Sequence, residues 1–193
     1  SLFLLDFWKV SIMKEYFHSV NLDKDKCRGC TNCIKRCPTE AIRVRKGKAQ
    51  IIKERCIDCG ECIRVCPYYA KTAISDRLEM INDYKFKVVM PAPSFYGQFD
   101  KKYSRSNILN ALKKIGFDHV FEVARAAEIV SEATRQLLAD KSAKKPMISS
   151  ACPGIVRLIQ VRFPSLIENI VKLESPMEVA AKIVKTQLQE TSK

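Results

Sequence analysis

The chain contains one pattern of cysteines twice: residues 27–38 read Cys27-Arg-Gly-Cys30-Thr-Asn-Cys33-Ile-Lys-Arg-Cys37-Pro38, and residues 56–67 read Cys56-Ile-Asp-Cys59-Gly-Glu-Cys62-Ile-Arg-Val-Cys66-Pro67. Both runs have the spacing C-x2-C-x2-C-x3-C-P, which is typical of cysteines that hold 4Fe-4S clusters in pairs. In that arrangement three cysteines of a run bind one cluster and the fourth binds the other. The sequence therefore predicts two 4Fe-4S clusters, held by Cys27, Cys30, Cys33 and Cys66 (cluster 1) and by Cys37, Cys56, Cys59 and Cys62 (cluster 2).

Two other uses of clustered cysteines fit the sequence less well. A four-cysteine zinc site needs two C-x2-C pairs, but neither a third cysteine two residues on nor the closing x3-C-P. A disulfide framework forms in oxidising compartments, and the opening residues lack the basic leader and cleavage site of an export signal. We therefore expect a cytoplasmic, reducing location. Residues 1–12 are interpreted as a leader or an upstream extension before Met13.

The segment between the two runs predicts a β-hairpin. Residues 41–52 alternate apolar and basic side chains on both sides of a Lys-Gly turn. Its outward face is expected to be strongly positive, through Arg43, Arg45, Lys46 and Lys48. Within the runs, Gly29 and Gly60 are expected to let the backbone approach a cluster closely. A positive residue such as Arg28 would favour the reduced, more negative cluster.

Composition limits the classes of protein that the chain can belong to. With 193 residues, 47% hydrophobic and 28% charged, it is neither disordered nor fibrous. No run of about 18 apolar residues is present, so no membrane span is predicted. The formal net charge of +13 is compatible with an acidic protein partner, a nucleic acid or an anionic membrane surface, and the charge alone does not choose among them. Because no nucleic-acid-binding signature accompanies the charge, we expect an acidic redox protein such as a ferredoxin or flavodoxin instead.

After about residue 80 the sequence changes to an alternation of strands and helices. Strands are predicted at 86–90, 119–123 and 146–150, and the helices between them at 106–115 and 124–139. Further helices are predicted at 155–163, 165–171 and 176–189, the last with Ser175 as its N-cap. Strands that alternate with helices form a parallel sheet, so this part is predicted to be an α/β domain.

Taken together, these motifs resemble those of [FeFe] hydrogenases from about Met13 to the end of the chain. Besides the cysteine runs, the resemblance lies in Ala92-Pro93-Ser94 and in Ser149-Ser150-Ala151-Cys152-Pro153-Gly154, with Phe163-Pro164-Ser165 and Ser175-Pro176 downstream. It implies an α+β, ferredoxin-like two-cluster domain at 13–80, followed by a partial α/β domain at 81–193 whose strands are parallel.

The resemblance also implies roles for single residues. Ala92, Pro93 and Ser94 would line the pocket of a diiron centre, and Cys152 would ligate the cubane of the H-cluster. Ala151 occupies the position of the cysteine that relays protons in fast members of the family. Alanine carries no exchangeable proton, so the chain is similar to the sensory branch, and this chain alone supplies no catalytic residue.

Two functions remain open at this stage. The first is electron transfer by the N-terminal portion of an [FeFe]-hydrogenase-like enzyme or sensor. The H-cluster cubane needs four cysteines and only Cys152 remains, so we expect a truncated chain whose hydrogen chemistry depends on a missing C-terminal region or a partner chain. The second is a stand-alone ferredoxin-type electron carrier with a non-catalytic attached domain, in which Cys152 is an ordinary free thiol.

Overall fold

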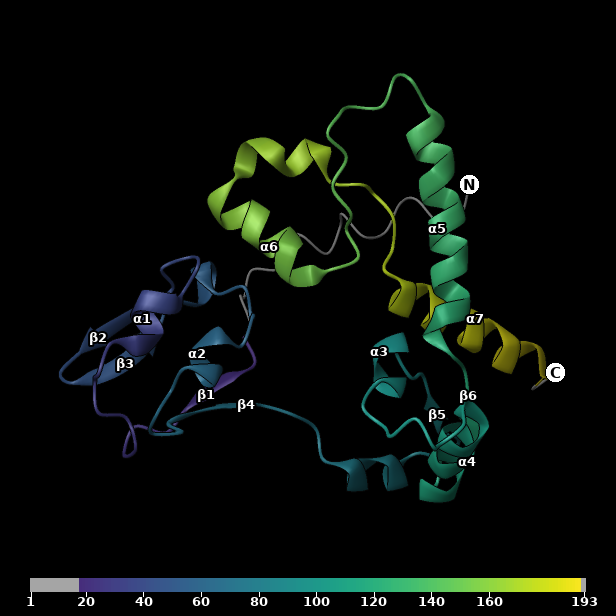
Figure 1. The fold of residues 1–193 in the computed structure, drawn as a ribbon, viewed down its shortest axis with the longest axis horizontal. Coiled ribbons are helices and arrows are strands. Elements are labelled where there is room, and N and C mark those ends of the chain that lie inside the picture. Colours follow the sequence, from purple (N-terminus) through teal and green to yellow (C-terminus); the bar gives the residue numbers. More distant parts are fainter. Residues whose placement is uncertain (1–17, 192–193) are drawn as a thin grey trace. The chain divides into compact units, whose positions relative to one another are not determined.

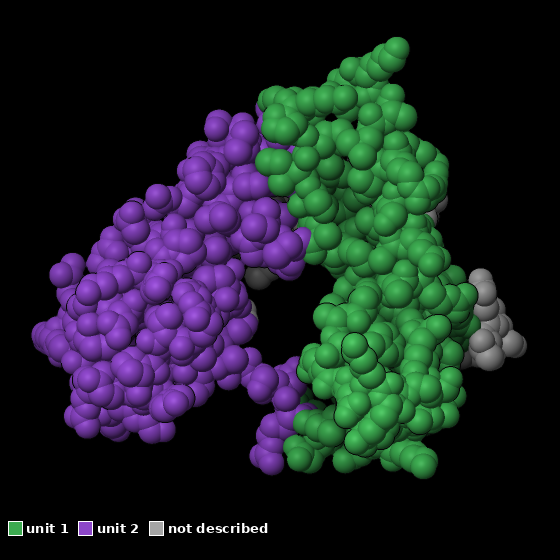
Figure 2. Space-filling view, in the orientation of Figure 1, with its two compact units in different colours: residues 1–7, 78–151, 171–193 green, residues 8–77, 152–170 purple. Residues whose placement is uncertain are grey.

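The computed structural model describes residues 18–191, so the expected leader at 1–12 and Met13 lie outside the described residues (Figure 1). The described chain divides into two compact units (Figure 2). The cysteine-rich unit contains residues 18–77 and 152–170, and the second unit contains residues 78–151 and 171–191. The units therefore do not follow the chain as two consecutive blocks.

Two pairs of antiparallel strands form the frame of the cysteine-rich unit. Strand β1 (Val20–Leu22) pairs with β4 (Lys71–Ala73), and β2 (Ile42–Arg45) pairs with β3 (Lys48–Ile51). The hairpin predicted at 41–52 is therefore confirmed. At its turn Lys46 and Gly47 have φ values of 50° and 72°, as a type I′ turn requires of its two central residues.

The two strand pairs repeat one register at an offset of 29 residues, the separation of Cys27 and Cys56. Leu22 is paired with Lys71, and the corresponding residues Ile51 and Ile42 are paired in the hairpin. The short helices α1 (Asn32–Arg36) and α2 (Glu61–Arg64) are related by the same offset. The duplicated sequence thus forms a duplicated structure, with a 3₁₀ turn, η2 (Lys53–Arg55), between its halves.

Helix α6 (Pro153–Arg162) and the 3₁₀ segment η4 (Pro164–Asn169) belong to the same unit. The Arg157 guanidinium donates a hydrogen bond of 2.6 Å to the carbonyl oxygen of Glu54, and Arg162 donates one of 3.1 Å to Glu40. These bonds join α6 to the cysteine-rich segment about a hundred residues earlier in the chain. The helix predicted at 155–163 is confirmed, whereas the predicted α-helix at 165–171 is a 3₁₀ segment.

The second unit has a short parallel strand pair and a helical core. Strand β5 (Val88–Val89) pairs in parallel with β6 (His119–Val120), which confirms parallel strands in this part. Around it lie η3 (Leu78–Asp83), α3 (Pro93–Tyr96), α4 (Arg105–Ile115), α5 (Val123–Ala139) and α7 (Pro176–Thr191). Its buried core comprises residues from β6 to α5 and from α7: Phe121, Val123, Ala126, Val179, Ala180 and Val184.

Helix ends in this unit follow the local sequence. The Ser104 hydroxyl accepts a hydrogen bond from the backbone N–H of Asn107 at the start of α4, and Gly116 ends the helix with φ 119°. The predicted cap of α7 is confirmed: Ser175 accepts from the backbone N–H of Glu178, whose carboxylate in turn accepts from the backbone N–H of Ser175. This reciprocal pair is a capping box.

Two expectations for this unit are wrong. The predicted strand at 146–150 does not join β5 and β6. Pro146 lacks a backbone donor, and the Ile148 carbonyl instead accepts from the backbone N–H of Val171 at 2.8 Å. The apolar spacing at 124–139 also predicts a buried face through Ile129, Ala133 and Leu137. Ile129 is instead 50% exposed, and the buried positions of α5 are Val123 and Ala126. Between residues 18 and 191, no helix has both the length and the apolar character of a membrane span.

Candidate metal centres

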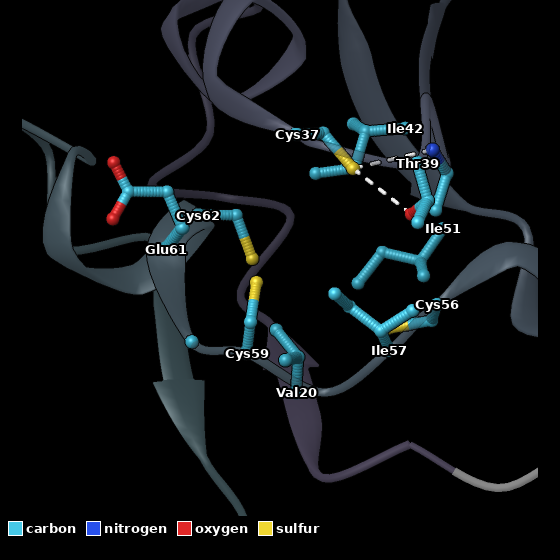
Figure 3. A pocket seen from close by; sticks show the side chains of 12 residues that line it. Val20, Cys37, Thr39, Ile42, Ile51, Cys56, Ile57, Cys59, Glu61 and Cys62 are labelled. Carbon is cyan, nitrogen blue, oxygen red and sulfur yellow. Dashed lines mark hydrogen bonds between the residues drawn. The ribbon is translucent and has the colours of Figure 1, made fainter. Parts of the chain in front are cut away.

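Eight cysteines line two cavities in the cysteine-rich unit. The first cavity is lined by Cys27, Cys30, Cys33 and Cys66. The second cavity is lined by Cys37, Cys56, Cys59 and Cys62 (Figure 3). Each encloses roughly 350 Å³ of space, including solvent at its mouth. Each cavity therefore gathers three cysteines of one run and the fourth cysteine of the other, the grouping that the spacing predicts for two cluster sites.

The loops that carry these cysteines depend on left-handed backbone conformations at matching positions. Gly29 and Asp58 have φ values of 66° and 55°, and Thr31 and Gly60 have values of 66° and 71°. Because left-handed residues reverse the chain tightly, each loop turns its first two cysteines toward one cavity, together with the third cysteine in the helix that follows. Helices α1 and α2 follow immediately, and the fourth cysteine of each run comes after the helix.

Backbone N–H groups point at several of the sulfur atoms. Ala41 donates to Cys37 Sγ at 3.2 Å, and its counterpart Ala70 donates to Cys66 Sγ at 3.3 Å. Ala49 donates to Cys27 Sγ at 3.4 Å. The hydroxyl oxygen of Thr39, a fully buried residue, lies 3.7 Å from Cys37 Sγ. Such donors stabilise negative charge on sulfur, as in a metal-bound thiolate.

Burial disfavours charged thiolates when no metal is present. It raises the pKa of the Cys33 and Cys56 thiols, and raises that of Cys62 to about 11. Burial acts in the same direction on Cys27, but the N–H groups of Ala49 and Gly29, with Lys48 and Lys71, lower its pKa overall. Because metals bind the thiolate, a positively charged metal centre would have to offset this effect of burial, and the donor groups at Cys27 act in the same direction as such a centre.

The arrangement also bears on the two alternatives for these cysteines. All nine cysteines are unpaired, so no disulfide framework is present. Within residues 18–191, no three His, Cys, Asp or Glu side chains are grouped around a position for a single metal ion. In the second cavity the sulfur atoms of Cys59 and Cys62 point toward one another (Figure 3).

The remaining predicted site residues lie outside both cavities. Cys152 is exposed and forms the N-cap of α6, in the cysteine-rich unit. Ala151 precedes it and is also exposed. Ala92 is half-buried at the N-cap of α3, and Pro93 and Ser94 are exposed in the first turn of that helix, in the second unit.

One residue at the first cavity was missed by the sequence analysis. Lys71 is only 3% exposed, and it lines the cavity with Cys27, Cys33 and Cys66. A buried lysine is rare unless it is paired. The duplication offers a signal in the sequence that position 71 is buried, because the corresponding residue 29 positions earlier is the apolar Ile42.

Comparisons with known proteins agree with this geometry. The family profile "4Fe-4S dicluster domain" matches residues 19–67, and "Iron only hydrogenase large subunit, C-terminal domain" matches residues 85–193. The periplasmic [Fe] hydrogenase large subunit of Nitratidesulfovibrio vulgaris is 30% identical over 188 residues, which cover 88% of this chain and 45% of the relative. The NADP-reducing hydrogenase subunit HndD of Solidesulfovibrio fructosivorans is 26% identical, over 86% of this chain and 27% of its own length. The chain thus spans less than half the length of these curated relatives.

Proposed function

The chain belongs to the family of iron-only hydrogenase large subunits, and from this premise we propose that it carries electrons through two 4Fe-4S clusters toward the hydrogen-converting part of such a protein. The observation that most directly supports this proposal is that each cavity is lined by four cysteines, three from one run and one from the other. Iron–sulfur clusters supply one-electron transfer when bound.

The residues of the chain have three tasks in this proposal. The cysteine thiolates of the first cavity hold cluster 1, and those of the second cavity hold cluster 2. The N–H groups of Ala41, Ala49 and Ala70 stabilise the negative charge on the sulfurs that they contact. Apolar side chains also line the second cavity and limit the access of water: Val20, Ile42, Ile51 and Ile57.

The fit of an iron–sulfur cluster to these sites rests on the donors. Four thiolates are the usual ligand set of a 4Fe-4S cluster. The buried thiols with raised pKa values need a strong cation to become thiolates. Four-cysteine zinc sites use two C-x2-C pairs, whereas each of these cavities takes three cysteines from one run and a fourth from the other.

The role of the second unit is proposed from family membership. Cys152 is proposed to ligate the cubane of the H-cluster, and Ala92, Pro93 and Ser94 to line the diiron pocket. Hydrogen oxidation, proton reduction or hydrogen sensing would be an activity of the complete protein. Since Ala151 cannot transfer a proton, we expect slow turnover or a sensory role rather than fast catalysis.

The partner and the compartment also belong to the proposal. Arg45 and Lys46 are exposed at the hairpin turn, and they suit the docking of an acidic ferredoxin or flavodoxin. The unpaired cysteines support a reducing, cytoplasm-like compartment. The Nitratidesulfovibrio relative is named periplasmic, and this name describes the location of the relative alone.

Anaerobic reconstitution tests the proposal. Protein purified without oxygen should be brown and should contain about eight iron and about eight sulfide ions per chain, as two 4Fe-4S clusters require. Reduction should then produce the electron paramagnetic resonance (EPR) signals of two interacting clusters. Colourless protein, or protein that holds zinc in place of iron, would overturn the proposal.

A further inference from the structure

The side chain of Lys71 carries an amino group into the buried part of the cysteine-rich unit. Its residue is 3% exposed, and its Nζ atom makes no hydrogen bond to any group in the described part of the chain. It is held on β4, paired with Leu22 of β1. A buried ammonium without a counter-charge is costly, so a bound anion beside it would stabilise it.

The surroundings of Lys71 identify where that anion would be. Lys71 lines the first cavity together with the thiols of Cys27, Cys33 and Cys66. Its charge acts on Cys27 and Cys33 of that cavity, and also on Cys62 of the second cavity. The ammonium therefore acts on ligands of both proposed clusters while forming part of the wall of the first.

The duplication shows that this charge is a difference between two otherwise matching sites. The counterpart of Lys71 is Ile42, which is 2% exposed and lines the second cavity. Their strand partners, Leu22 and Ile51, are both apolar and also occupy matching positions. Nothing in the fold of this position requires a charge, since the other half holds isoleucine there.

Three further pairs differ in the same direction. At the cavity walls Arg28 corresponds to Ile57 and Asn32 to Glu61, and within the cysteine loops Gly29 corresponds to Asp58. In each pair the residue of the first loop is the more positive one. Lys48 adds a hydrogen bond to the carbonyl oxygen of Cys27. The Asp58 carboxylate acts on Cys56 by raising its pKa, alongside the larger effect of burial.

We propose that Lys71 is the counter-ion of cluster 1 and gives this cluster a higher reduction potential than cluster 2. Reduction adds one electron to a cluster and makes it more negative by one charge. A fixed ammonium in a buried site stabilises the reduced form more than the oxidised form. The two clusters are thus unequal, and an electron that enters the pair resides on cluster 1. This inference rests on the proposed pair of clusters.

The test is a potentiometric titration of the anaerobic full chain, with dithionite as the one-electron donor, redox mediators, and EPR detection. The wild type should show two midpoints. Lys71→Ile, which copies the other half, should lower the higher midpoint toward the lower one. At the wild-type upper midpoint, the ratio of reduced to oxidised cluster should fall at least about tenfold, equivalent to about 59 mV for a one-electron couple.

Two variants separate the charge from other effects. Lys24→Ile removes the same charge from an exposed position shortly before Cys27, and it should leave both midpoints almost unchanged because solvent screens this lysine. Lys71→Arg keeps the charge and should retain the higher midpoint. A single wild-type midpoint, a shift confined to the lower midpoint, or equal shifts in Lys71→Ile and Lys24→Ile would overturn the inference.

Measuring the iron content distinguishes a failure of this inference from a failure of the proposed function. Wild-type protein without iron–sulfur clusters would defeat the proposed function itself, whereas normal iron with unshifted midpoints would defeat only the role of Lys71. If Lys71→Ile binds too little iron to titrate, Lys71→Met and Lys71→Arg replace it. Iron binding by the arginine variant alone supports a counter-ion, and loss of iron in both shows a packing role and overturns the inference. If the methionine variant binds iron, its midpoints decide the question in the same way.

Discussion

Gly29 approaches Gly47 so closely that a Cβ atom on Gly29 would lie 2.6 Å from the carbonyl oxygen of Gly47. The contact joins the first cysteine loop to the turn of the β2–β3 hairpin. Real Cβ atoms do not approach a backbone oxygen this closely. The close approach of Gly29 is thus made with the hairpin, and the expected approach of Gly29 and Gly60 to a cluster stays a prediction.

Gly29→Ala should destabilise the protein by more than the strain of a left-handed alanine alone, which costs about 1 to 2 kcal/mol. Gly60→Ala is the matched control, because Gly60 has φ +71° but a Cβ atom added there would meet no other atom within 4 Å. Chemical denaturation of the two variants measures the difference. Equal losses in the free energy of unfolding would show that the hairpin turn moves away from the new methyl group without loss of stability.

The crossed ligand sets predict which serine variants resemble one another. Cys66→Ser should lose the same EPR signal as Cys30→Ser, although Cys66 belongs to the second run, because both line the first cavity. Cys37→Ser should resemble Cys59→Ser in the same way. Iron content should fall by about half in each variant, since each cluster has its own four ligands.

Cys152→Ser is the control for that series, because Cys152 lines neither cavity. It should retain both signals and all the iron of the two clusters. A Cys66→Ser variant that loses the same signal as Cys59→Ser would contradict the crossed assignment.

The Glu122 carboxylate links α5 to two other elements, and this predicts a dependence of stability on pH. It accepts hydrogen bonds from the Arg105 guanidinium and from the Tyr96 hydroxyl. The Arg105 bond is the main cause that lowers the pKa of Glu122 below its ordinary value of 4.5. Because the folded-state pKa is lowered, this stabilisation is complete above about pH 4.5 and is lost as the pH falls through the folded-state value.

Glu122→Gln should therefore lower the free energy of unfolding by about 1 to 2 kcal/mol at pH 7, and the difference from wild type should shrink below about pH 4.5. Urea unfolding of the metal-free chain, followed by circular dichroism between pH 3.5 and 7, measures this. Glu128→Gln, at an exposed position of the same helix, controls for loss of a carboxylate. A difference that does not change with pH would contradict the predicted pKa shift.

The basic hairpin predicts a salt-dependent encounter with an acidic electron carrier. Replacing the exposed Arg45 and Lys46 with glutamate should slow electron transfer from reduced ferredoxin about tenfold at low ionic strength. Stopped-flow rates at increasing salt should converge with those of the wild type, because salt screens exposed charges. Lys101→Glu alters an exposed lysine of the other unit, and a comparable loss there would assign the effect to net charge alone.

Much of the secondary structure was predictable because its causes are local. The Lys46-Gly47 turn, the Gly116 stop of α4 and the Ser175 cap of α7 each depend on residues a few positions apart. The third strand at 146–150 was not predictable in this way. A strand exists only where another strand is available to pair with it, and the bond of Ile148 to Val171 lies outside any local pattern.

In the candidate site, too, some features follow from the local sequence and others depend on distant contacts. The spacing of the cysteines is sufficient to predict which four belong together, since the ligand geometry of a cube is encoded in gaps of two and three residues. By contrast, the burial of Lys71 depends on the pairing of β4 with β1, about 50 residues earlier in the chain. A lysine in a short strand does not itself show whether its end reaches water, and the sequence hints at the burial only through the apolar counterpart Ile42 in the other half.

By itself, the sequence determined the duplicated cysteine loops, the hairpin between them and most helix boundaries, because these follow from contacts between near neighbours and from the fixed geometry of the backbone. Only the tertiary structure decided that Gly29 contacts Gly47, that α6 joins the cysteine-rich unit through Arg157 and Glu54, and that Lys71 lies buried beside the first cavity. These relationships arise between residues far apart in the chain, where burial and pairing depend on how the elements pack.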